Sequence, residues 1–67
     1  MSNFEDLQNK VRKLQSRAGN AKMSLHDLAE DLPVNWTEIK AVAEKTFEIF
    51  AELDAAKTEL ASWERSR

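Results

Sequence analysis

The sequence contains no cysteine and no tyrosine, and only one glycine, one proline and one histidine among its 67 residues. Without cysteine there are no disulfides and no thiolate metal ligands, which fits a reducing compartment. A single glycine excludes a glycine-rich phosphate-binding loop. One histidine without pocket-forming loops cannot supply a nucleophile, a base and an orienting group together. We therefore expect a protein that is not an enzyme.

Long apolar runs and strong charge imbalance are also missing. No stretch reaches the 18 or more apolar residues typical of a membrane span, and Met1-Ser2-Asn3 leads directly into a helical pattern rather than a signal peptide. The net charge is −2, with both signs interspersed, so the composition shows no bias toward nucleic acid or membranes. These features predict a cytoplasmic protein.

The first half of the chain carries apolar or small residues at alternating spacings of three and four. This ladder predicts one amphipathic helix over residues 3–32 with a coiled-coil-type seam, and Ser2 with Glu5 has the spacing of a capping box at its start. The ladder consists of Phe4, Leu7, Val11, Leu14, Ala18, Ala21, Leu25, Leu28 and Leu32.

Pro33 ends this helix, because proline lacks an N–H and disfavours helical geometry in the residue before it. A connector of residues 33–35 follows, and Asn35 with Glu38 can cap a second helix over residues 36–64. The second ladder consists of Ile39, Val42, Thr46, Ile49, Leu53, Ala56, Leu60 and Trp63. Residues 1–67 are thus predicted to form a single all-α, antiparallel helical hairpin.

The short connector fixes which residues lie side by side. In an antiparallel hairpin of this length, residues whose numbers sum to about 67 lie at the same height. Small Ala56 then falls opposite Val11, and Trp63 falls opposite Phe4. This register predicts alternation of large and small side chains across the seam, as close packing requires.

The second helix has more apolar surface than one partner helix can cover. A chain of this size is only marginally stable alone and commonly gains stability from a second subunit. We therefore predict that the hairpin dimerises into a four-helix bundle, although Phe47 alone could also be an ordinary half-exposed aromatic. The predicted oligomer interface consists of Ala43, Phe47, Phe50 and Leu53, beside Trp36.

His26, Asp27 and Glu30 point away from the seam and are the candidate ligands for a weak divalent metal such as nickel, zinc or iron. His26 and Glu30 are four residues apart and share a face of the helix. A second subunit or the second helix would have to complete the site. The alternative is a solvated acidic turn in which Glu30 simply pairs with His26.

Basic residues of the first helix form a second candidate site. They could contact phosphates if a dimer repeated them on one surface, which gives an RNA-binding helical bundle as the alternative function. No aromatic residue lies among them to stack on a base, so nucleic acid is the less favoured partner. The cluster consists of Lys10, Arg12, Lys13, Arg17 and Lys22.

Four segments are distinctive: residues 11–16, 42–47, Glu52-Leu53 and, above all, the run Ala21-Lys22-Met23-Ser24-Leu25-His26-Asp27-Leu28-Ala29-Glu30-Asp31-Leu32-Pro33. These segments resemble the Rop-like family of small proteins encoded in nitrogen-fixation gene clusters. The resemblance implies a hairpin that dimerises into a four-helix bundle, a genomic link to nitrogenase, and a metal association in some members. It implies no defined activity.

The function we expect is that of a non-enzymatic accessory protein of nitrogen fixation. In this hypothesis a homodimeric bundle docks on a nitrogenase component or on its assembly machinery. His26, Asp31 and Trp36 at the closed end of the hairpin are the predicted docking residues, because charged groups around an exposed aromatic are a common interface arrangement.

Overall fold

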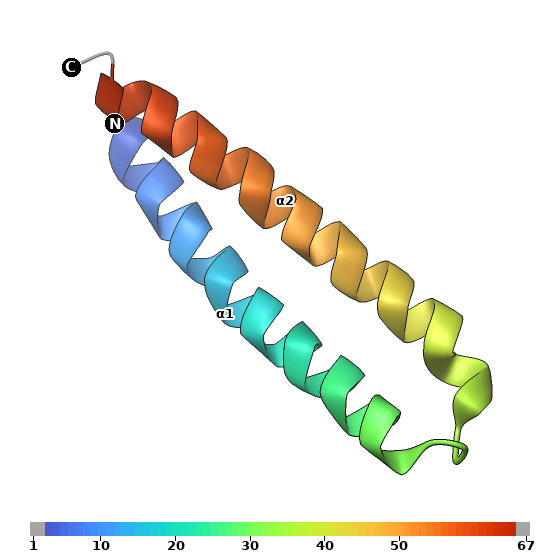
Figure 1. Cartoon of the computed structure of the whole chain (residues 1–67). Helices are drawn as coiled ribbons and strands as arrows, with labels where there is room; N and C mark the ends of the chain where they lie inside the picture. The colour runs from blue at the N-terminus through green and yellow to red at the C-terminus, as the bar shows by residue number, and fades with distance from the viewer. Residues whose placement is uncertain (1–2, 66–67) are drawn as a thin grey trace.

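The chain folds into two long antiparallel helices, in a computed structural model that describes residues 3–65. Helix α1 spans Asn3–Asp31, a 3₁₀ turn η1 spans Trp36–Glu38, and helix α2 spans Ile39–Arg65. The hairpin measures 50 × 16 × 14 Å, and the ends of α1 and α2 that are far from the connector lie next to each other (Figure 1). Residues 3–65 contain no strand. The predicted all-α hairpin is confirmed.

The connector is closed by backbone hydrogen bonds. The N–H of Val34 donates to the carbonyl of Asp31 at 2.9 Å, and the N–H of Trp36 donates to the carbonyl of Pro33 at 3.3 Å. These bonds lie between the end of α1 and the start of η1, where Pro33 prevents the helix from continuing. The predicted capping box at the other end of α1 involves Ser2, which lies outside the described residues.

Asn35 does not cap the second helix with its side chain, and that prediction is wrong. Its backbone is left-handed, with φ 59° and ψ 27°, and its side chain makes no capping hydrogen bond. Asparagine is one of the few residues that tolerates this conformation. The Asn35 carbonyl instead accepts a hydrogen bond from the N–H of Glu38 at 2.9 Å. The chain therefore enters α2 through the tighter turn of η1.

The predicted register is confirmed at the open end of the molecule and near its middle. The rings of Phe4 and Trp63 lie 6.1 Å apart between centroids, tilted by 47°. The Thr46 hydroxyl lies 3.5 Å from the Ala21 carbonyl. Both pairs sum to 67, as the length of the connector requires.

The buried core lies in the half of the hairpin that is far from the connector, which we call the open half. Val11, Leu14 and Ala56 form its centre, with Leu53 and Leu60 packed against them. The expected opposition of Val11 and Ala56 is therefore present. The buried apolar residues among those that the structure describes are Leu7, Val11, Leu14, Ala18, Ile49 and Ala56.

The half of the hairpin next to the connector, the closed half, is packed less completely. Leu25 and Leu28 are half-buried, whereas Leu32 and Ile39 are each 40% exposed, although both belong to the predicted seam. No residue between 19 and 48, a range that the structure describes in full, is buried. Two helices alone cannot enclose side chains at the end of their own seam.

Gly19 is not required by the packing of the hairpin. A Cβ atom built at this position would meet nothing within 4 Å, so the glycine is not needed to make room for α2. Gly19 follows Ala18 of the core and occupies an exposed position in the middle of α1. Glycine at such a position costs a helix about 1 kcal/mol relative to alanine.

Candidate functional site

The hairpin has two faces of different chemistry, and Thr46 lies on the seam between them. Its hydroxyl donates to the Val42 carbonyl at 2.8 Å and lies 3.5 Å from the Ala21 carbonyl on α1, so Thr46 faces the seam. Lys45 and Phe47 flank it, each turned by about 100° around the helix in opposite senses. Lys45 and Phe47 therefore lie on opposite faces of the hairpin.

The Phe47 face carries an apolar stripe along α2, which consists of Ala43, Phe47, Phe50 and Leu53 and is the predicted oligomer interface. Phe47 is 73% exposed and Phe50 41% exposed. Ala43 is half-buried, and Leu53 packs against the core cluster of its own hairpin. Leu53 thus serves the hairpin core, while Phe47 is left almost free of intramolecular contacts.

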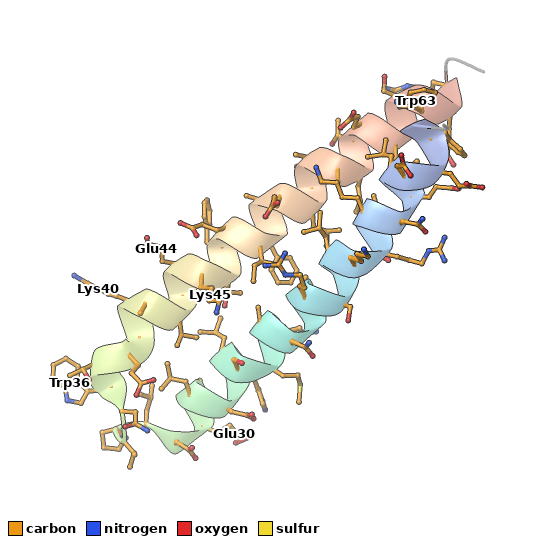
Figure 2. All side chains as sticks on the ribbon, turned by 180° about the vertical axis from the view of Figure 1, so that it is seen from behind. Glu30, Trp36, Lys40, Glu44, Lys45 and Trp63 are labelled. Atoms are coloured by element: carbon orange, nitrogen blue, oxygen red, sulfur yellow. The ribbon has the colours of Figure 1, made fainter. Side chains whose placement is uncertain are left out.

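A second exposed apolar cluster lies at the closed end, around the connector. Trp36 is 64% exposed, and Figure 2 shows its side chain pointing away from the helices. The predicted docking residues His26 and Asp31 are also exposed, near the end of α1. Val34 is 60% exposed and was not among the predicted docking residues. The sequence did contain a signal for its role, because Val34 is an apolar residue within the predicted connector and apolar side chains are unusual in an exposed turn.

The candidate metal ligands are only partly brought together. His26 Nε2 lies 3.1 Å from Glu30 Oε1, and the two side chains are 61% and 67% exposed. Asp27 is the next residue after His26 and is turned by about 100° from it around α1. Within residues 3–65 no three histidine or carboxylate side chains are placed to hold a metal ion. A single hairpin therefore offers one exposed pair of ligands.

The basic residues of α1 do not form one surface. Lys10, Lys13 and Arg17 line a common hollow, but Asp6 and Glu52 line it as well. Arg12 is one residue from Lys13 and five from Arg17 and is not among the residues lining that hollow. The two carboxylates offset much of the positive charge that phosphate binding would use.

Neither helix within residues 3–65 combines the length and apolar character needed to cross a lipid bilayer. The helical surface instead carries charged side chains along its length (Figure 2).

Comparison with known proteins gives consistent matches over nearly the whole chain. UPF0437 protein y4xE of Sinorhizobium fredii is 66% identical over 67 residues, which is 100% of both chains. A Frankia alni protein described as "UPF0437 protein in nifX-nifW intergenic region" is 47% identical over 60 residues, 90% of this chain and 72% of that protein. Both relatives align with this chain over nearly the whole length of the hairpin.

A solved structure shares the fold. The crystal structure of a DUF683-family protein from the cyanobacterium Cyanothece 51142 superposes with a TM-score of 0.87 at 58% identity, covering 88% of this chain and 97% of that chain. The sequence profile of the Rop-like family matches residues 2–65. The family profile and a full-length relative both match this helical hairpin over nearly its whole length. The chain therefore belongs to the Rop-like family.

Proposed function

We propose that this chain is a non-enzymatic accessory protein of nitrogen fixation, acting as a homodimeric four-helix bundle that docks on a nitrogenase component or on its assembly machinery. The observation that carries the proposal is the exposure of large apolar side chains on a hairpin with little core of its own. Phe47 is 73% exposed and Trp36 is 64% exposed. Exposed apolar surface of this kind marks interaction sites.

Two separate surfaces suit two separate partners. The stripe with Phe47 runs along α2 and can be covered by a second hairpin, which would complete a four-helix bundle. Trp36 lies at the closed end among charged residues, and such a surface favours a transient partner. The nitrogen-fixation context is supported by the Frankia alni relative, whose name places its gene between nifX and nifW.

Replacing His26 and Trp36 together by alanine tests the docking surface. Both side chains are exposed, so the variant should keep its helical content and its oligomeric state. We expect loss of co-purification with nitrogenase-related proteins and slower growth on dinitrogen, with unchanged growth on ammonium. Tagged pull-down from nitrogen-fixing cells and growth curves measure these effects.

Arg12→Ala is the control, because it truncates another large exposed side chain, in the open half of the hairpin and away from the connector. This control should retain both co-purification and growth on dinitrogen. A deletion strain that fixes nitrogen normally under varied oxygen and metal supply, together with a pull-down free of nitrogenase-related proteins, would contradict the proposed function.

We further propose that His26 and Glu30 form part of a weak site for nickel, zinc or iron, with Asp27 or residues of another chain completing it. Two exposed ligands 3.1 Å apart provide an open site with water in the remaining positions. Isothermal calorimetry should give no better than micromolar binding, lost in His26→Ala. Lys22→Ala, an exposed change one turn earlier on α1, should leave it intact; equal binding by wild type and His26→Ala rules the site out.

A further inference from the structure

The Lys45 face of the hairpin carries three hollows in a row between α1 and α2. They have volumes of about 360, 390 and 320 Å³. The first and second share Arg17, and the second and third share Asp6 and Lys10. We call the row the furrow. From Asp6 to Ser24 it follows α1 for about 27 Å, at 1.5 Å per residue.

The first hollow has an apolar floor and a basic rim. Ala21, Val42 and Ile49 line its floor, and Arg17 and Lys45 line its edge. It exists because the α1 residues here, Ala21 and Ser24, are too small to fill the space beside α2. Of the described residues that line it, none is acidic. Figure 2 shows Lys45 over the space between the helices, whereas Lys40 points away from α1.

The charge changes sign along the furrow. The first hollow is lined by two cations, Arg17 and Lys45. The second is lined by three cations and two carboxylates, and the third by Lys10 with the two carboxylates of Asp6 and Glu59. The furrow is thus basic toward the closed half and acidic toward the open half, so an elongated ligand would bind in one orientation.

We infer that the furrow docks an amphipathic helix of a partner protein. Apolar side chains of that helix lie over the apolar floor of the first hollow, its acidic end lies over Arg17 and Lys45, and its basic end lies over Asp6 and Glu59. An open furrow with an apolar floor in its first hollow and charged edges along its length suits recognition of a helix in a groove. An enclosed cavity would suit a small molecule better. The inference does not depend on a role in nitrogen fixation.

The furrow remains available in the proposed dimer. Lys45 and Phe47 lie on opposite faces of the hairpin, so a second copy that covers the apolar stripe leaves the furrow exposed. A symmetric dimer would then carry two furrows on its outer faces.

The test uses the full-length protein and a fluorescent helical peptide of about 18 residues, the length that matches the furrow at 1.5 Å per residue. The peptide has leucines along one face, glutamates in one half and lysines in the other. Fluorescence anisotropy at low ionic strength should show saturable binding. A peptide of the same composition with its charges interleaved should bind at least about tenfold more weakly, which corresponds to ~1.4 kcal/mol.

Lys45→Glu and Arg17→Glu reverse the charge at the basic end of the furrow without touching the core, because both side chains are exposed. Each should weaken binding of the polarised peptide by about tenfold or more. Lys40→Glu is the matched control: it makes the same charge change on the same helix, away from the furrow. It should change the dissociation constant by less than about twofold, a difference of ~0.4 kcal/mol.

Four outcomes overturn the inference. One is equal weakening by Lys40→Glu and Lys45→Glu, which would indicate general electrostatic attraction. Another is the absence of saturable peptide binding at millimolar concentration. A third is tighter binding of a single-stranded RNA probe that requires Arg17 and Lys45. The last is a higher oligomer of this chain, detected by sedimentation and lost in Lys45→Glu, which would place a further copy in the furrow.

Discussion

Leu53→Glu should strongly destabilise the folded hairpin. Leu53 is partly buried against the cluster of Val11, Leu14 and Ala56, and a carboxylate placed there loses part of its hydration without gaining a partner. A domain of this length is stable by only about 3–10 kcal/mol, so a cost of about 2–4 kcal/mol removes much of that margin. Thermal unfolding followed by far-UV circular dichroism measures the loss.

Ala55→Glu is the control for this variant. It introduces the same carboxylate two residues away, at an exposed position of α2, and substitutions of that kind usually change stability by no more than about 0.5 kcal/mol. A Leu53→Glu protein that melts with the same midpoint as Ala55→Glu would contradict the packing described for the open half.

Phe47→Glu should separate the proposed dimer into monomers. Phe47 is 73% exposed in the single hairpin, so the substitution removes little packing within one chain. Burial of an aromatic side chain contributes about 1.5–3 kcal/mol, and a symmetric dimer loses two of them. The dissociation constant should rise by about a hundredfold or more.

Sedimentation equilibrium over a range of concentrations measures this change, with Ala55→Glu again as control. Two results would count against the apolar stripe as the interface: a wild-type protein that is monomeric and fully helical at micromolar concentration, or a Phe47→Glu protein that dimerises as tightly as wild type. Because Phe47 and Leu53 differ in burial within the hairpin, the two variants distinguish loss of dimerisation from loss of the fold.

The positions of the helices and their register could be predicted because both follow from short-range patterns in the sequence. The spacing of apolar residues defines the seam of each helix, Pro33 ends the first helix, and a connector of a few residues then leaves one antiparallel register. The contacts of Phe4 with Trp63 and of Thr46 with Ala21 follow from these facts alone.

Other features depend on how the two helices meet in space. Asn35 has the residue type of a helix cap, but the tight turn after Pro33 places its backbone in the left-handed region, where its side chain makes no capping bond. Leu32 and Ile39 fit the apolar ladder yet stay 40% exposed, because nothing beyond the connector covers them. The furrow was not predicted, since it combines residues of α1 and α2 that are more than twenty positions apart, such as Arg17 and Lys45.

The uneven burial along the hairpin bears on how it would recognise a partner. Within residues 4–65, every buried side chain lies between Leu7 and Ala18 or between Ile49 and Ala56, whereas His26, Asp31 and Trp36 lie in the closed half. That half is held by few buried contacts and should open locally at a lower free energy than the rest. A ligand that binds there must also order the segment it contacts, so part of its binding energy is spent on local folding. The affinity of a partner for the closed end would then depend on the stability of the turn as much as on the complementarity of the two contacting surfaces.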